Sequence, residues 1–289
     1  MTGRSATPHL PLALVVGCGG LAMACARRLG QSHRLIVVDR DEATADGAAA
    51  LLNAEGHEAS GFACDVGNLA AVRALAAALV RDGKFHTIAH VVGLAPSSGD
   101  VRAILRVNAT GAAAVADSFL PLLDDQGAAV FVSSLGGHIV PAPPDLYPIL
   151  DDPLSIDFLE SVEAVAGDAL NSSTAYAWSK IALMRMCVRL APSWGARGAR
   201  INSLSPGLIE SPMGAREFAD EPRKVGLLAM VPLGRQGSMI EVADAVEFLC
   251  SSRASYISGT DLLIDGGVAA AVRQAPAAAV CEPATMNAQ

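Results

Sequence analysis

Short apolar runs alternate with alanine-rich stretches along this chain, and this alternation constrains the fold more than any other feature. The first runs are Leu12 to Val16, Leu35 to Val38, His57 to Ala63, Thr87 to Val92 and Ala128 to Val132, and two more follow late, Ala199 to Leu204 and Leu262 to Ile264. Each predicts a strand, and the segments between them, such as Asp41 to Ala54 and Leu69 to Val80, predict helices. Strands that alternate with helices form a parallel sheet covered on both faces. We therefore expect an α/β fold with a doubly wound, seven-stranded parallel sheet in a single domain over residues 1–289.

A glycine-rich turn, Gly17-Cys18-Gly19-Gly20-Leu21-Ala22, joins the first expected strand to the first expected helix. The order strand, glycine turn, helix is the context in which a G-x-G-x-x-G/A pattern indicates dinucleotide binding. Gly17 permits the tight turn, Gly19 or Gly20 lets a pyrophosphate approach the backbone, and Ala22 allows close packing. The N-terminus of the helix would face the phosphates. The turn predicts a Rossmann-like domain, the alternative being a glycine turn that binds nothing.

The second expected strand ends in an acidic residue, Asp39. A carboxylate placed roughly twenty residues after the glycine turn accepts hydrogen bonds from the adenosine ribose hydroxyls. It would also repel a 2′-phosphate, so NAD is favoured and NADP is less favoured. Arg40 weakens this preference, because an arginine can stack on adenine or pair with a phosphate. The other explanation is that Asp39 only caps the next helix. Asp65, after the third strand, is placed to meet the adenine amino group.

A tyrosine and a lysine, Tyr176 and Lys180, lie one helical turn apart in Ala175-Tyr176-Ala177-Trp178-Ser179-Lys180. If the segment is helical, both side chains leave the same face. A free tyrosine loses its proton near pH ~10, and a lysine one turn away favours the phenolate and lowers that pKa. Such a tyrosine can exchange a proton with an alcohol or a ketone. The alternative is an ordinary surface pair.

Taken in order, these motifs resemble the short-chain dehydrogenase/reductase family over nearly the whole chain. The resemblance also rests on Val107-Asn108-Ala109-Thr110-Gly111, on Ser134 after the fifth strand, and on Arg200 to Gly207 and Gly259 to Gly267. It implies a catalytic tetrad of Asn108, Ser134, Tyr176 and Lys180. It implies cofactor contacts at Gly17, Gly19, Gly20, Leu21, Asp39, Arg40, Asp65, Val66, Gly93, Tyr176, Lys180, Pro206, Gly207, Ile209 and Ser211.

The same resemblance implies a role for each of these residues. Tyr176 would exchange the proton, Ser134 would donate to the substrate oxygen, and Lys180 would hold the nicotinamide ribose. Asn108 would hold a water that links Lys180 to solvent. The Ile209 backbone and the Ser211 hydroxyl would bind the carboxamide. Ser133 and Ser134 have a simpler alternative, as hydroxyls that merely end a strand.

The chain departs from the family pattern at three places. The glycine loop is one residue shorter, and Val91-Val92-Gly93-Leu94-Ala95 replaces the usual Asn-Asn-Ala-Gly. Ser134 and Tyr176 lie 42 positions apart, where the family usually has roughly a dozen, so the chain carries an insertion at about 138–173. A similar insertion, with the neighbourhoods of Trp194-Gly195 and Val231 to Arg235, makes the pattern most similar to bacterial 3α-hydroxysteroid dehydrogenase/carbonyl reductases.

The insertion is expected to be partly helical, because loops of this length inside compact domains usually have structure or a function. We expect it to overhang the substrate pocket, or to serve only packing or subunit contacts. The family usually pairs subunits through the helices after strands four and five, and the insertion leads into the second of these. A homodimer or homotetramer is therefore expected, with an interface that the insertion reshapes. His138 would touch the substrate or be a solvated loop histidine.

Charge and composition exclude several other classes. The net charge is -8 and the chain has no basic block, which argues against nucleic acid as a partner. No apolar run reaches the ~18 residues that a membrane span needs. The histidines show no H-x-x-x-H spacing, so no metal site is expected. The 6 cysteines show no C-x-x-C pairing, which favours a reducing compartment and a cytoplasmic protein. Residues from about 270 to 289 are expected to form a flexible tail.

The sequence thus predicts an NAD(H)-dependent oxidoreductase that interconverts a secondary alcohol and a ketone. Met213 to Leu228 would be a mobile lid, and Met213, Phe218, Leu227 and Met230 suit a hydrophobic, steroid- or terpenoid-like substrate, unless they are ordinary helix core. One alternative is a nucleotide-sensing regulator with the same fold and no turnover. Another is an NAD-dependent epimerase, against which the short chain after Gly207 argues.

Overall fold

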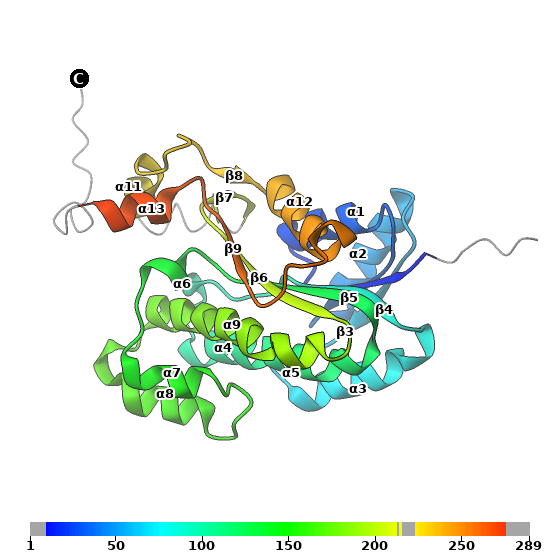
Figure 1. Ribbon diagram of the computed structural model, residues 1–289, viewed down its shortest axis with the longest axis horizontal. Helices are drawn as coiled ribbons and strands as arrows, with labels where there is room; N and C mark the ends of the chain where they lie inside the picture. The colour runs from blue at the N-terminus through cyan, green and yellow to red at the C-terminus, as the bar shows by residue number, and fades with distance from the viewer. Residues whose placement is uncertain (1–9, 213, 216–222, 276–289) are drawn as a thin grey trace, which may run out of the picture.

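A parallel seven-stranded sheet forms the centre of the computed structural model, which describes residues 10–212, 214–215 and 223–275. The strand order is β3-β2-β1-β4-β5-β6-β9 (Figure 1). The strands are β1 (Leu12–Val16), β2 (Arg34–Asp39), β3 (Ala59–Ala63), β4 (Phe85–His90), β5 (Leu123–Val132), β6 (Arg200–Pro206) and β9 (Asp261–Ile264). The predicted α/β fold is confirmed. The order reverses between β1 and β4, and ligands of such sheets bind beside the carboxyl ends of the strands at this point.

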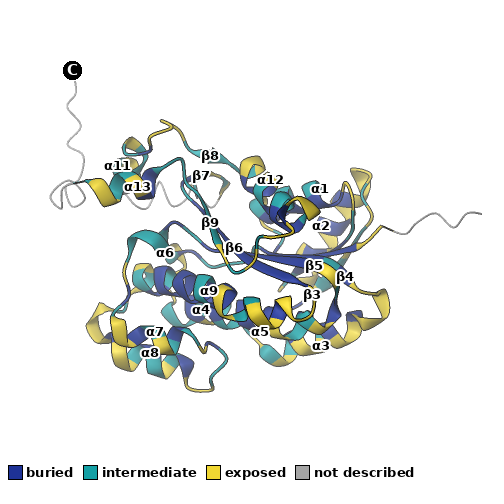
Figure 2. Cartoon of the chain, viewed as in Figure 1, coloured by how far each residue is buried: buried dark blue, intermediate teal, exposed yellow. Residues whose placement is uncertain are grey.

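Two apolar cores lie on the two faces of the sheet. The helices of one face are α1 (Gly20–Leu29), α2 (Glu42–Ala54) and α12 (Met239–Cys250), and those of the other are α3 (Leu69–Leu79), α5 (Gly111–Phe119) and α9 (Ser172–Gly195). In β1, Ala13 and Val15 face the first core, whereas Leu12, Leu14 and Val16 face the second. This alternation follows from the two-residue period of a strand, and both faces are apolar because both are covered (Figure 2).

Several boundaries differ from the predicted ones. Strand β4 ends at His90, because the amides of Val91 and Val92 both donate to the Val16 carbonyl, at 2.9 and 2.8 Å, and leave the ladder. A small second sheet, β7 (Ile209–Glu210) with β8 (Gly237–Ser238), was not predicted. The helix expected around Asn108 is divided into α4 (Val101–Leu105), a π-helical turn (Arg106–Thr110) and α5.

The insertion is partly helical, as predicted. It contains α6 (Gly136–Ile139), α7 (Tyr147–Leu150) and α8 (Phe158–Ala166), with short 3₁₀ turns between them. The second and third of these helices lie against α4 and α9 (Figure 1). The buried side chains of this cluster include Leu146, Leu150, Phe158 and Val162 of the insertion, and Ile104, Leu105 and Trp178 of α4 and α9.

Polar contacts at the rim fix the same packing. The Trp178 indole donates to the Pro141 carbonyl at 3.1 Å. Arg185 of α9 donates to the Asp151 carboxylate at 2.7 and 2.5 Å, and Arg102 of α4 pairs with Glu160 and Glu163. The insertion is therefore anchored on α4, which precedes Asn108, and on α9, which carries Tyr176 and Lys180.

The last described elements are α11 (Arg223–Ala229) and α13 (Val268–Gln274). Residues 270–274 of the segment expected to form a flexible tail are helical, and Val268 and Ala269 bury the start of α13 beside α6. The flexibility of this segment stays a prediction. The rest of the expected tail lies outside the described residues. Among the described residues, every helix is too short or too polar to span a membrane.

Candidate active site

The predicted site residues gather at the carboxyl ends of the strands, along one side of the sheet. Five of them lie at the carboxyl ends of the parallel strands β1, β2, β4, β5 and β6, or up to 3 residues beyond: Gly17, Asp39, Gly93, Ser134 and Pro206. Because carboxyl ends of parallel strands meet at the same edge, the topology brings together residues that are far apart in the sequence. This edge includes the point at which the strand order reverses.

The glycine turn has the geometry of a phosphate-binding loop. Gly17 has a φ of +108°, and a Cβ there would lie 3.1 Å from the Val92 nitrogen. Gly19 is the N-cap of α1, and a Cβ on it would meet no heavy atom within 4 Å. The first amides of a helix have no partner within the helix and carry its positive end. The open backbone at Gly19 and the amides of Gly20 and Leu21 therefore fit a pyrophosphate.

The carboxylate of Asp39 lies beside this turn. It accepts from the Cys18 amide at 3.2 Å through one oxygen and from the Asp41 amide at 3.3 Å through the other. The alternative that Asp39 caps the next helix is not what the structure shows, because Asp41 is the N-cap of α2 and accepts from the Thr44 amide at 2.8 Å. Arg40 is exposed.

Two predicted cofactor contacts, Asp65 and Val66, follow β3. Asp65 is exposed, and its carboxylate accepts from the Gly67 amide at 2.9 Å. Val66 is buried, and its Cγ2 would lie 2.9 Å from a Cβ on Gly111. A glycine at 111 thus lets α5 approach the loop after β3.

Tyr176 and Lys180 lie in the first turns of α9, as the spacing predicts. A capping box starts this helix: Asn171 accepts from the Thr174 amide at 3.1 Å, and the Thr174 hydroxyl accepts from the Asn171 amide at 2.9 Å. Tyr176 forms a hydrogen bond with Ser134. The Lys180 ammonium donates to the Val132 carbonyl at 3.0 Å and lies 5.6 Å from the centroid of the Tyr176 ring.

The ionisation of the pair differs from the expectation that Lys180 lowers the pKa of Tyr176. Burial raises the pKa of Tyr176 above its ordinary value, although the Ser134 hydrogen bond acts in the opposite direction. Burial also lowers the pKa of Lys180 to about 8. Burial thus disfavours the charged form of both side chains, and it moves the Tyr176 pKa in the direction opposite to the expectation. At neutral pH Tyr176 is a protonated phenol beside a charged ammonium.

Asn108 lies in the π-helical turn and is buried, with 1% of its surface exposed. Its amide oxygen accepts from the Leu94 nitrogen at 2.8 Å, and its amide nitrogen donates to the Leu94 oxygen at 3.0 Å and to the Ser179 hydroxyl at 3.2 Å. A Cβ on Gly93 would lie 3.2 Å from the Lys180 ammonium and 3.3 Å from Asn108 Oδ1. The structure thus brings Gly93, Asn108 and Lys180 together. The water expected on Asn108 stays a prediction.

The remaining predicted contacts lie after β6. A Cβ on Gly207 would lie 2.6 Å from the Asp265 Cα, so this position requires glycine. Ile209 pairs with Gly237 in the small sheet, and the Ser211 hydroxyl accepts from the Gly214 amide at 2.9 Å. Met213 and Phe218 of the expected lid lie outside the described residues.

An apolar cluster surrounds the corner between Ser134 and the loop after β6. Its buried members are Leu135, Leu208, Val231, Val268 and Ala269. Partly buried side chains pack against them, among them Ile139, Leu227, Leu228 and Met230. The residues directly after Ser134 and Gly207 therefore belong to one apolar wall, in which Leu227 and Met230 take part.

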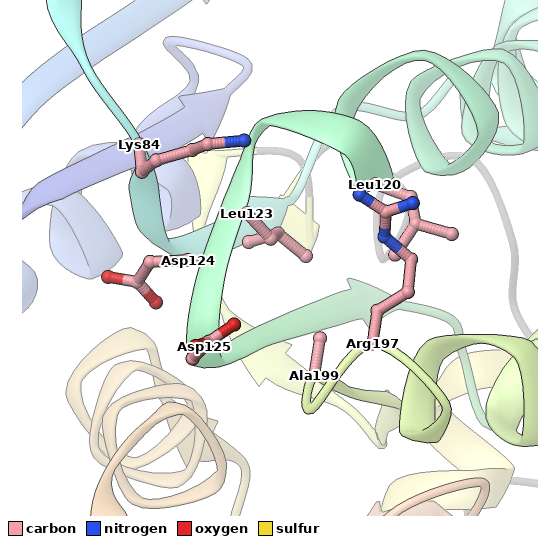
Figure 3. A pocket seen from close by; sticks show the side chains of 7 residues that line it. All are labelled: Lys84, Leu120, Leu123, Asp124, Asp125, Arg197 and Ala199. Atoms are coloured by element: carbon pink, nitrogen blue, oxygen red, sulfur yellow. The ribbon is translucent and has the colours of Figure 1, made fainter.

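Two hollows have none of Asn108, Ser134, Tyr176 and Lys180 in their lining. One of about 290 Å³ lies between α6, the start of α7 and α9, and includes His138, Tyr147 and Arg185 in its lining. The other, of about 510 Å³, lies near the start of β5, at the amino ends of the strands (Figure 3). Its lining is Lys84, Leu120, Leu123, Asp124, Asp125, Arg197 and Ala199, which includes no predicted site residue. Within the described ranges no group of three His, Cys, Asp or Glu side chains is arranged to hold a metal ion.

Sequence reasoning missed the partners of His138. This side chain is neither solvated nor alone: 18% of it is exposed, and its Nε2 lies 2.8 Å from Asp261 Oδ2. The two residues are 123 positions apart, so no local pattern in the sequence connects them.

Comparison with known proteins adds the following. A family model described as Enoyl-(Acyl carrier protein) reductase matches residues 17–150 and 146–269. The chain is 30% identical over 261 residues to a short-chain dehydrogenase/reductase of Alternaria brassicicola, covering 89% of this chain and 95% of the relative. It is 31% identical over 265 residues to the 3-alpha-hydroxysteroid dehydrogenase/carbonyl reductase of Comamonas testosteroni, covering 82% and 98%. Among solved structures, the 3-alpha-hydroxysteroid dehydrogenase from Pseudomonas sp. B-0831 complexed with NADH has a TM-score of 0.74 at 26% identity, covering 92% and 99%.

Proposed function

This chain belongs to the short-chain dehydrogenase/reductase family, and from that membership we propose that it uses NAD(H) to interconvert a hydrophobic secondary alcohol and its ketone. The family assignment makes it an NAD(P)-dependent oxidoreductase acting on CH-OH groups. The observation that carries the proposal is the position of the Lys180 ammonium, 5.6 Å from the centroid of the Tyr176 ring, with the Ser134 hydroxyl near the same ring.

The choice of NAD over NADP rests on Asp39. Its carboxylate hydrogen-bonds the Cys18 amide in the glycine turn, so it is held where the adenosine ribose would lie. A phosphate on that ribose would meet a negative charge at short range. Arg40 is exposed and next in the chain, and it is the residue that would have to compensate if NADP were preferred.

The proton chemistry follows from the protonation states of the tetrad. When bound, a nicotinamide cofactor supplies or accepts the hydride. Tyr176 is protonated at neutral pH because burial raises its pKa, so it donates its proton to the oxygen of a ketone. Ser134 accepts from the Gly136 amide at 3.2 Å. Its own proton, which serves the Tyr176 oxygen in the free protein, would turn to the substrate oxygen as negative charge develops there. In the oxidation direction Tyr176 takes the alcohol proton as the phenolate, a form that its raised pKa disfavours at neutral pH.

The substrate class is argued from the apolar cluster that contains Leu135 and Leu208. These residues follow Ser134 and Gly207 directly, so a substrate whose oxygen meets Ser134 has apolar side chains beside its carbon skeleton. Two of the similar proteins are named hydroxysteroid dehydrogenases. We therefore include steroid- and terpenoid-like alcohols in the proposed class.

The assembly and the cellular location of the protein remain predictions. Assembly as a homodimer or homotetramer and a cytoplasmic location follow from the sequence patterns alone. The regulator without turnover is not favoured, because Asn108, Ser134, Tyr176 and Lys180 are all present. Each of these side chains is held by hydrogen bonds to neighbouring groups of the same site.

The test has two stages. Calorimetric titration of the purified protein with NADH and with NADPH comes first, with Asp39→Asn as the matched variant. We expect NADH to bind at least about tenfold more tightly to the wild type, and Asp39→Asn to lose that preference. A panel of steroid and terpenoid alcohols, with short aliphatic alcohols as the control, is then tested with NAD. Preference for NADPH would refute the cofactor proposal, and turnover confined to the short alcohols would refute the substrate proposal.

A further inference from the structure

The carboxylate of Asp261, at the start of the edge strand β9, collects three hydrogen bonds. One oxygen accepts from the hydroxyls of Ser203 and Ser205 at 2.6 and 3.0 Å, and the other lies 2.8 Å from His138 Nε2. Because a carboxylate only accepts, the histidine nitrogen donates. Only 13% of the Asp261 side chain is exposed, so the pair is largely shielded from water.

His138 lies four residues after Ser134, in the short helix α6. This helix also contacts Tyr176, since a Cβ on Gly136 would lie 3.5 Å from Tyr176 Cε1 and 3.7 Å from Ser134 Oγ. The Gly136 amide donates to that same serine oxygen. The position of α6 therefore sets the direction of the Ser134 hydroxyl.

A helix of four residues is not stable without contacts to the rest of the protein. Nucleation costs more than a single turn returns, so such an element depends on tertiary contacts. The structure gives α6 no side-chain cap at its N-terminus. Gly137 rests closely on α9, where a Cβ would lie 2.6 Å from Met184 Cε. His138 supplies the link to the other side, to β9.

We propose that His138 is a positioning residue: its bond to Asp261 holds α6 so that the Ser134 and Tyr176 hydroxyls keep the relative position that proton transfer requires. The role rests on the proposed function, because it is defined by the alcohol–ketone reaction. The His138–Asp261 ion pair connects the start of the insertion with the last strand of the sheet. Arg185, which lines the same hollow as His138, is already paired with Asp151 and does not compete for Asp261.

The chain offers a conservative variant and a matched control. His138→Leu removes the donor, whereas His138→Gln keeps an amide nitrogen at a similar reach. His86→Leu is the control, because His86 Nδ1 lies 3.1 Å from Asp124 in a second His–Asp pair at the other end of the sheet. Where His138→Leu fails to fold, His138→Ala removes the same donor without adding a large apolar group.

We expect His138→Leu to lower kcat by about tenfold or more, since displacements of about 1 Å at a reacting group have effects up to about 100-fold. NADH affinity should stay within about twofold, His138→Gln should keep kcat within about threefold of the wild type, and His86→Leu should have the wild-type kcat. An unchanged kcat in His138→Leu, an equal loss in His86→Leu, or a loss confined to NADH affinity would overturn the proposal.

A measurement without substrate separates this proposal from the proposed function. The amides of Gly137 and Val140 donate within α6, to Ser134 and Gly136 at 3.1 Å each. Their hydrogen exchange should be faster in His138→Leu than in the wild type, and unchanged in His86→Leu. If the wild type turns over no alcohol, the proposed function fails, and this exchange still decides whether His138 holds α6. Equal exchange in all three proteins would refute the positioning role.

Discussion

Replacing Asn108 by alanine would remove three hydrogen bonds from the centre of the active site in one step. The side-chain amide bonds both backbone groups of Leu94, at 2.8 and 3.0 Å, and the Ser179 hydroxyl at 3.2 Å. The hydroxyl keeps its own bond to the Tyr176 carbonyl at 2.7 Å, so Ser179 is not left without a partner. The Leu94 amide and carbonyl are the groups that lose theirs.

The size of the effect follows from those two groups. A buried backbone group without a partner costs about 1–3 kcal/mol, and the two Leu94 groups are partly buried, so Asn108→Ala should lower the free energy of unfolding by about 2–5 kcal/mol. For a chain of this size, 1 kcal/mol shifts the melting temperature by about 2–4 °C, which predicts a fall of about 4–20 °C. Activity should fall as well, because Gly93 and Lys180 lie against the same amide.

Thermal unfolding followed by circular dichroism measures this shift. Ser118→Ala is the control on the neighbouring helix α5, because the Ser118 hydroxyl is buried and has no partner among the described residues. Its removal should change the stability by less than about 1 kcal/mol. If Asn108→Ala melted within about 2 °C of Ser118→Ala while kcat fell, Asn108 would act only through a bound water, and the structural role argued here would be refuted.

Three further predictions concern single positions. Tyr176→Phe should lower kcat by about 10²–10⁴-fold with NADH affinity within about threefold, and a kcat within tenfold of the wild type would exclude the phenol as the proton donor. Lys180 has a folded pKa of about 8, below its ordinary value of 10.5, so the unfolded chain binds more protons between these values and the fold gains stability as the pH rises through them. Relative to Lys180→Met, the wild type should gain up to about 3 kcal/mol in urea unfolding between pH 7 and about pH 10, and a flat difference would contradict the buried charge. Gly207→Ala should cost about 1–3 kcal/mol because a Cβ would lie 2.6 Å from the Asp265 Cα, whereas Gly47→Ala in the open part of α2 should add about 0.5–1 kcal/mol, and chemical unfolding of both compares the signs.

The strands of the main sheet were predictable because their signal is local. Runs such as Leu12 to Val16 are apolar, short and bounded by turn residues, and each became a strand within a few positions of its predicted ends. The two-residue strands β7 and β8 gave no such signal, since no period can be read from two residues. The helix α13 is stabilised by the burial of its first residues beside α6. This contact between distant parts of the chain cannot be inferred from the local alanine-rich sequence.

The candidate site divides in the same way. Tyr176 and Lys180 are found from their spacing within one helix, and Asp39 from its distance to the glycine turn. The direction of the Tyr176 pKa shift was predicted wrongly, because it depends on how deeply the fold buries the phenol. The His138–Asp261 pair joins residues 123 positions apart and exists only once β9 has been added to the edge of the sheet.

The packing of the insertion on the catalytic helix has a consequence for heat inactivation. Trp178, between Tyr176 and Lys180, is buried among insertion side chains and bonded to Pro141. We expect melting of the insertion to release the turn of α9 that carries Tyr176 and Lys180, so that the two segments open as one cooperative unit. The temperature at which this segment opens is therefore a ceiling on the temperature at which the enzyme works, however stable the sheet beneath it remains.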